Sequence, residues 1–150
     1  MRWVDRIRRR LRMDPPVVLL EKGFMEAVVT DDHPAHASAV AVYSSLVDDY
    51  EAERVLIRAV DEHLPPSGRP RRLGAFAPVE PLHVAGQHRR AVDLMLEGDD
   101  VDDPDHAMTL VMLERHAIRT IATFDERYTA FDLEIVPPAA VPASTPSPAP

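Results

Sequence analysis

The sequence predicts an α/β fold in which a parallel sheet is covered by helices on both faces. Two observations carry this prediction: short apolar runs of the kind that form buried strands recur along the chain, and segments with helical spacing lie between most of them. Strands that alternate with helices are typical of parallel sheets, because a parallel pair needs a long crossover connection. The chain of 150 residues is long enough for one such domain.

The first half of the chain contains two apolar runs and two main helical patterns. In chain order, we expect a strand at 16–20, a helix at 24–29, a helix from about 33 to 50, a strand at 55–57 and a short helix at 61–64. The long helix repeats Ala39, Val42 and Leu46 on one face. Pro65 and Pro66 end the short helix, since proline removes a backbone donor and restricts the residue before it.

The second half of the chain continues the alternation to residue 136. In chain order, we expect an extended segment at 75–77, a helix within 80–96, a helix at 104–116 and strands at 119–123 and 133–136. Gly98 suits the end of the first of these helices. Pro104 suits the start of the second, where its missing N–H would have no helical partner.

Charge and proline content divide the chain into three parts. Residues 1–13 form a basic extension with six arginines and one acid, which suits contact with RNA phosphates, a membrane surface or an acidic partner, or lies upstream of a second start at Met13. Residues 14–136 form the folded domain. Residues 137–150 hold six of the 15 prolines and no charge, and we expect this tail to be disordered.

Composition excludes several classes of protein. The absence of cysteine excludes disulfide scaffolds, cysteine–zinc sites, iron–sulfur clusters and thiol nucleophiles. No stretch approaches about 18 consecutive apolar residues and the start does not resemble a secretory signal, so we expect a cytoplasmic protein without a membrane span. The formal net charge of −8 opposes simple electrostatic capture of nucleic acid, unless some of the acids hold divalent cations.

Acidic residues follow the predicted strands at positions where ligands gather in parallel sheets. Glu21 ends the first strand, Asp61 follows the second, and Asp125 lies two residues beyond a third. Asp105 lies in the first turn of the helix that leads into that third strand. Converging carboxylates repel one another unless a cation lies between them, and hard divalent cations prefer oxygen ligands. The four acids therefore predict a site for a hard divalent cation, although Asp61 and Asp105 are also placed to cap helices.

Two segments near the C-terminus resemble the PIN-domain family. Asp105 opens a helix in the sequence DHAMTL, and the strand in RTIATFDERY ends in Thr123 and Asp125, with Tyr128 following. The opening is similar as well: a hydrophobic strand ends in Glu21, and a short helix and a His-containing loop precede a long helix. By position, Asp105 and Asp125 match the third and fourth acids of the family, and Thr123 matches its supporting hydroxyl.

The resemblance implies both an architecture and an activity. The architecture is a three-layer α/β/α sandwich around a parallel sheet. The activity is that of an endoribonuclease that depends on Mg²⁺ or Mn²⁺, with Glu21, Asp61, Asp105 and Asp125 as metal ligands and Thr123 beside them. Because many small bacterial members are toxins of type II toxin–antitoxin pairs, the resemblance also implies an RNA substrate, an antitoxin partner and a homodimer.

The sequence departs from the family at two of the four acids. Glu21 stands where the family has Asp, and its extra methylene moves the carboxylate by about 1.5 Å. Lys22 follows it and is placed to pair with neighbouring acids. The second acid of the family has three candidates here: Asp61, Glu62 and Glu80. These departures favour an alternative function, a catalytically degenerate PIN-like module that binds RNA or protein.

Overall fold

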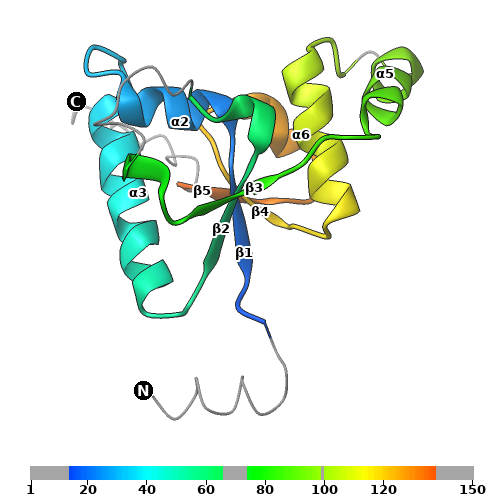
Figure 1. Ribbon diagram of the computed structural model, residues 1–150. Helices are drawn as coiled ribbons and strands as arrows, with labels where there is room; N and C mark the ends of the chain where they lie inside the picture. Colours follow the sequence, from blue (N-terminus) through cyan, green and yellow to red (C-terminus); the bar gives the residue numbers. More distant parts are fainter. Residues whose placement is uncertain (1–13, 66–73, 99, 138–150) are drawn as a thin grey trace, which may run out of the picture.

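The structure is a computed structural model that describes residues 14–65, 74–98 and 100–137 (Figure 1). The predicted basic extension at 1–13 lies outside the described residues, and so does the proline-rich tail beyond residue 137. Within the described ranges, no helix has the length and apolar character needed to cross a membrane.

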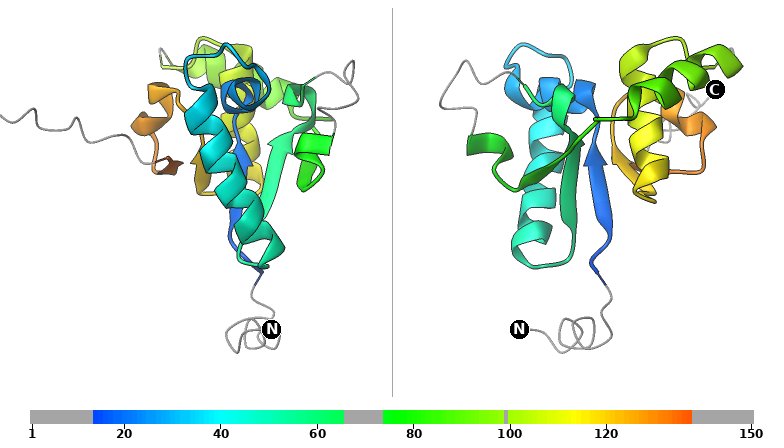
Figure 2. Two further views of the ribbon diagram at one scale, coloured as in Figure 1. Left: turned by 90° about the vertical axis from the view of Figure 1, so that its left-hand side faces the viewer. Right: turned by 45° about the vertical axis from the view of Figure 1, so that its right-hand side comes forward.

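Five strands of the described chain form one parallel sheet in the order β3-β2-β1-β4-β5. The strands are β1 (Val17–Leu20), β2 (Leu56–Val60), β3 (Val79–Leu82), β4 (Thr120–Ala122) and β5 (Glu134–Val136). The α-helices are α2 (Lys22–Val29), α3 (His36–Glu51), α5 (His88–Glu97) and α6 (Pro104–Arg115). Helices α2 and α3 lie on one side of the sheet, and α5 and α6 lie on the other (Figure 1 and Figure 2). The predicted three-layer α/β/α architecture is therefore confirmed.

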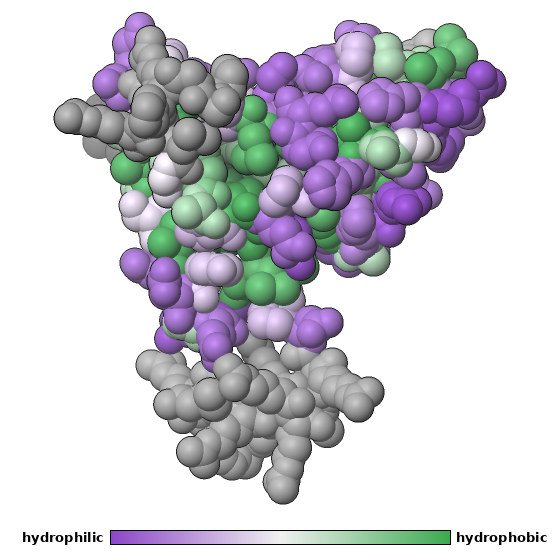
Figure 3. All heavy atoms as spheres, viewed as in Figure 1, coloured by the Kyte–Doolittle hydropathy of each residue, from purple (hydrophilic) through white to green (hydrophobic). Residues whose placement is uncertain are grey.

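The core divides at β1, because successive side chains of a strand point to opposite faces. Leu19 packs with the apolar residues of α6, whereas Leu20 packs with Phe24 and Met25 of α2, and all four are fully buried. A strand buried on both faces contains a continuous apolar run, which is the signal that predicted β1. Outside this core, the surface over α5 and α6 is mainly hydrophilic (Figure 3).

Helix α2 begins two residues before the predicted start. Glu21 is its N-cap, and the carboxylate accepts a hydrogen bond from the backbone N–H of Gly23. This cap satisfies a donor that the first turn would otherwise leave unpaired, and it compensates for the low helical propensity of Gly23. Helix α3 begins later than predicted, because the backbone N–H of Ala35 donates to Nδ1 of His33 at 3.0 Å and holds a turn there.

One expectation for the middle of the chain is wrong, and one strand there was not predicted. Residues 75–77 are predicted to be extended, but Gly74–Phe76 form a 3₁₀ turn, η2. The segment from residue 80 contains α5 as expected, yet its first residues belong to β3, a strand that the sequence pattern did not predict. Pro81 fits there because β3 is an edge strand, where a missing N–H does not break the ladder.

The sheet grows in opposite directions from β1. Strands β2 and β3 extend it on one side, and β4 and β5 extend it on the other. At such a switch point, the connections leave in opposite directions and open a crevice at the C-terminal ends of the two central strands. Leu20 of β1 pairs with Ala122 of β4. The residues that follow these two strands therefore lie side by side at the crevice.

Candidate active site

Glu21 lies at the C-terminal end of β1 and is largely buried, with 8% of its surface exposed. One carboxylate oxygen, Oε1, accepts a hydrogen bond of 2.9 Å from the hydroxyl of Thr123, and Oε2 accepts one from the N–H of Gly23. Burial raises the pKa of the Glu21 carboxyl, while these two hydrogen bonds act in the opposite direction. A Cβ at position 23 would lie 3.1 Å from one carboxylate oxygen, so glycine permits the close approach.

The hydroxyl of Thr123 connects two of the predicted acids. It donates to Glu21 and accepts a hydrogen bond of 2.9 Å from the backbone N–H of Asp125. Only 2% of the surface of Thr123 is exposed, so water does not readily replace either contact. Thr123 therefore positions the carboxylate of Glu21 and the backbone of Asp125 at the same time.

Asp105 lies in the first turn of α6 but does not cap the helix. The N-cap is Asp103, whose carboxylate accepts from the backbone N–H of Asp105 at 2.9 Å, so the prediction of a capping role for Asp105 is wrong. The side chain of Asp105 is instead turned to other partners. Its Oδ2 lies 2.6 Å from Nζ of Lys22, and its Oδ1 lies 3.3 Å from Nε2 of His63. Lys22 thus pairs with a nearby acid, as its position in the sequence suggests.

Arg127 binds Asp125 with several donors. Its Nε lies 3.1 and 3.0 Å from the two carboxylate oxygens, and Nη2 lies 2.7 Å from Oδ2. The same guanidinium group reaches Asp103 at 3.4 Å and Asp102 at 3.5 Å. Hydrogen bonding by Arg127 holds the pKa of Asp125 below its usual range. Arg127 was not predicted from the sequence as a site residue, although its position two residues after Asp125 is a local signal.

The carboxylates of Glu21, Asp105 and Asp125 line one polar cavity of about 260 Å³. The charged residues that line it are Glu21, Glu26, Asp103, Asp105 and Asp125, with Lys22 and Arg127. Five carboxyl groups and two cations give the cavity an excess of acidic groups. Glu26 was not predicted, although it lies four residues after Lys22 and therefore on the same side of α2.

The candidates for the second acid do not line this cavity. Asp61 follows β2 as predicted, but its Oδ2 pairs with Nδ1 of His83 at 3.1 Å. Glu62 is exposed, and Glu80 lies on β3, where it pairs with Arg58 of β2. The structure therefore brings together three of the four predicted metal ligands and leaves Asp61 outside the cavity.

Two buried histidines accompany the site, and neither was predicted from the sequence. His63 and His106 are 5% and 1% exposed, and burial lowers the pKa of both. The ring of His106 packs edge-on against Tyr128, with ring centroids 4.7 Å apart. His63 reaches Asp105 across the crevice from the segment after β2.

The donors of the cavity suit a hard divalent cation, because they are carboxylate oxygens. Within the ranges that the structure describes, however, no three carboxylate or imidazole side chains are already grouped so that they could hold a metal ion together. Each of the three predicted acids in the cavity already has a partner. Glu21 accepts hydrogen bonds from Thr123 and Gly23, Asp105 pairs with Lys22, and Asp125 pairs with Arg127. A divalent ion would therefore have to replace at least one of these contacts.

We expect the Arg127→Met variant to be less stable than the wild-type protein at pH 7 and nearly as stable near pH 3. Because Arg127 lowers the pKa of Asp125, the pair stabilises the fold above the usual value of 3.8, and this stabilisation is lost as the pH falls through the lowered pKa. For a half-exposed network we expect roughly 1 kcal/mol, or a few degrees in Tm.

Thermal unfolding of both proteins between pH 7 and pH 3 measures this difference. Arg119→Met is the control, because it removes a single exposed contact of 3.3 Å to Asp132. A difference in Tm that stayed constant over the whole pH range would contradict the electrostatic explanation.

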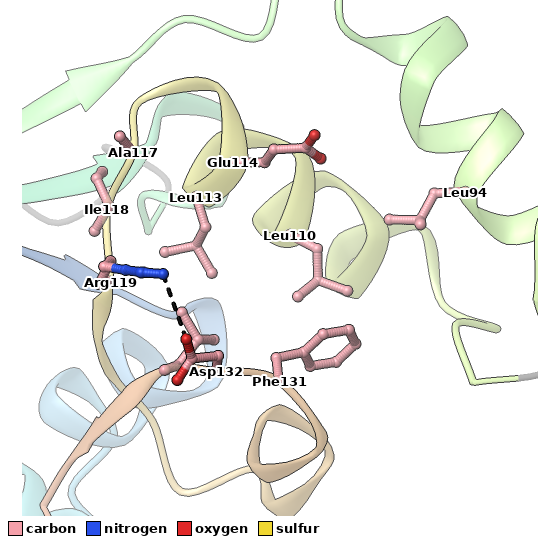
Figure 4. Close-up of a pocket in the computed structure, with 10 residues that line it drawn as sticks. Leu94, Leu110, Leu113, Glu114, Ala117, Ile118, Arg119, Phe131 and Asp132 are labelled. Carbon is pink, nitrogen blue, oxygen red and sulfur yellow. Dashed lines mark hydrogen bonds and ion pairs between the residues drawn. The ribbon is translucent and has the colours of Figure 1, made fainter.

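A larger cavity of about 550 Å³ lies away from the carboxylates (Figure 4). Its lining includes Leu110, Leu113 and Phe131, and the pair of Arg119 and Asp132 lies beside them. Residues 117–119, which also line it, precede β4, whereas the predicted acids follow the strands. Its lining is mainly apolar, so the acidic cavity remains the candidate site.

Comparisons with known proteins agree with the fold. No family model matches the chain, and no curated protein matches it. The crystal structure of VapC20 from Mycobacterium tuberculosis, a toxin that cleaves the sarcin–ricin loop, matches with a TM-score of 0.60 and 13% sequence identity, over 77% of this chain and 98% of that chain. At this identity the likeness shows the fold alone. The chain therefore has a VapC-like PIN fold, as its sequence resemblance implied.

Proposed function

We propose that this protein is an endoribonuclease that depends on Mg²⁺ or Mn²⁺ and cleaves phosphodiester bonds of RNA. The observation that carries the proposal is the convergence of Glu21, Asp105 and Asp125 on one polar cavity at the switch point of the sheet. The fold likeness to a toxin that cleaves a ribosomal RNA loop supports RNA as the substrate. On this proposal, Glu21, Asp105 and Asp125 hold the metal, and Asp61 contributes only if its pair with His83 opens.

The roles of the individual residues follow from their contacts. The side chains of Asp105 and Asp125 are 47% and 26% exposed, and they supply carboxylate oxygens that can turn toward a cation. Thr123 keeps the carboxylate of Glu21 in place, and Arg127 is close enough to the cavity to bind a phosphate oxygen. When bound, a divalent ion would act as a Lewis acid and lower the pKa of a water molecule bound to it.

The proposal extends to biological partners. As a toxin-like ribonuclease, the protein would be held inactive by an antitoxin, act in the cytoplasm and form a homodimer. These partners rest on the same resemblance as the activity and would be tested after it.

A second candidate function is a non-catalytic module that binds RNA or protein. It is favoured by the two cations of the cavity, since Lys22 already neutralises Asp105 and Arg127 already neutralises Asp125. Such a module would cleave no RNA, and its Tm would not depend on Mn²⁺.

The two functions are separated by incubating the purified full-length chain with end-labelled RNA. The substrates are a ribosomal RNA hairpin and a single strand of equal length, each with Mn²⁺, with Mg²⁺ and with excess EDTA. We expect cleavage of at least one substrate with a divalent ion and none with EDTA. Equal cleavage in EDTA, or no cleavage under any condition, would contradict the proposed function.

A further inference from the structure

Lys22 is the only lysine in the sequence, and it lies at the acidic cavity. Its Nζ lies 2.6 Å from Oδ2 of Asp105, which comes 83 residues later in the chain. The lysine is the first residue of α2 and directly follows Glu21. Lys22 is thus the chain neighbour of one predicted metal ligand, Glu21, and its ammonium group pairs with another, Asp105.

The two cations of the cavity are held very differently. Arg127 contacts three aspartates, and its planar fork fixes its orientation. Among the described residues, Lys22 forms an ion pair with one acid, Asp105, and the two side chains of this pair are 41% and 47% exposed. Such a pair is weak, and the flexible lysine stem lets the ammonium group leave without disturbing the helix. Lys22 is therefore the cation that can be displaced.

We propose that Lys22 is a built-in competitor for the divalent cation, so that a metal ion binds Asp105 only when the ammonium group moves away. A divalent ion bound to Asp105 would repel the ammonium group that lies 2.6 Å from the same carboxylate, so binding of the ion weakens the contact with Lys22. Lys22 thereby sets the concentration of metal at which the site fills. The inference deepens the proposed function, because it concerns the same metal site.

The consequence is that removal of the ammonium group tightens metal binding. Because the ammonium group is displaced when the ion binds, its cost to metal affinity is that of an exposed ion pair, a factor of up to about five. Lys22→Met keeps the length and apolar character of the stem, and Lys22→Gln keeps polarity without charge. We expect both variants to lower the Kd for Mn²⁺ by roughly two- to fivefold.

The matched control is Arg119→Met. It removes one positive charge from an exposed ion pair, with Asp132, that lies beside the apolar cavity. Both substitutions make the net charge more negative by one unit, so a general long-range attraction of cations would lower the Kd equally in the variant and in the control. If the effect of Lys22 is local, the Kd of the control stays close to that of the wild-type protein.

The experiment is calorimetric titration of the full-length proteins with MnCl₂, with the Mn²⁺-induced rise in Tm as a second measurement. Adding Asp105→Asn to Lys22→Met should remove the gain in affinity, which would place the ion at that carboxylate. An unchanged Kd in both Lys22 variants, or an equal gain in Arg119→Met, would overturn the inference. So would the absence of Mn²⁺ binding in all variants at millimolar concentrations.

The outcome is separate from that of the cleavage assay. Tight binding by the Lys22 variants together with no RNA cleavage would refute the proposed function and leave the inference standing. Cleavage by the wild-type protein, with Kd values that do not depend on Lys22, would refute the inference and leave the proposed function standing.

Discussion

The Asp125→Asn variant should lose metal-dependent RNA cleavage by at least about 100-fold. Asparagine has the same shape, and its Oδ1 can still accept a hydrogen bond from Arg127. The variant therefore removes a charge and one anionic oxygen while the loop after β4 keeps its backbone contact to Thr123. A carboxylate that holds a catalytic cation cannot be replaced by a neutral amide without weakening both binding and charge stabilisation.

The control for this prediction is Asp132→Asn. Asp132 also pairs with an arginine, Arg119, at 3.3 Å, but it lies at the apolar cavity on the other end of β4. Initial rates on the labelled RNA hairpin, measured with Mn²⁺ for both variants, check the expectation. Full activity in Asp125→Asn would exclude Asp125 as a metal ligand. Equal losses in the two variants would show that the loss reflects the fold and not the site.

The parallel sheet could be predicted because β1 and its neighbours are buried on both faces. Leu19 and Leu20 point to opposite sides and are both fully buried, so burial on both faces appears in the local sequence as a continuous apolar run. Strand β3 could not be predicted in this way. It lies at the sheet edge and has exposed Glu80 and Pro81 at its centre, so its sequence lacks both the apolar run and the expected alternation.

Two acids of the cavity could be predicted because each directly follows a strand of the sheet. Glu21 and Asp125 follow two paired central strands, so their proximity is a consequence of topology. Asp61 also follows a strand of the sheet, β2, yet it pairs with His83 from the segment after β3. Which carboxylate points into a cavity depends on partners far away in the sequence. The contact between Lys22 and Asp105, 83 residues apart, is of the same kind.

The Thr123→Val variant should be less stable than the wild-type protein by about 1–3 kcal/mol, which corresponds to a fall in Tm of roughly 4–12 °C. Valine has nearly the shape of threonine, so packing changes little. The hydroxyl, however, both donates to Glu21 and accepts from the N–H of Asp125. Its removal leaves a buried carboxylate with one donor fewer and a backbone N–H without its partner. Unpaired buried polar groups lower the free energy of unfolding more than the loss of an exposed hydrogen bond does.

The pH dependence identifies the carboxylate as the cause. The hydrogen bond from Thr123 lowers the pKa of Glu21 against the effect of burial, so its loss raises that pKa further above the usual value of 4.5. A buried carboxyl with a raised pKa destabilises the fold as the pH rises through that range, because the ionised form is the one that burial penalises. The deficit in Tm of Thr123→Val should therefore be larger at pH 8 than at pH 4. Thr129→Val, which removes an exposed hydroxyl bonded to the carbonyl of Glu126, should show a small deficit at both values. A Thr123→Val deficit that is independent of pH would mean that the hydroxyl supports only the backbone of Asp125 and does not hold Glu21 ready for a cation.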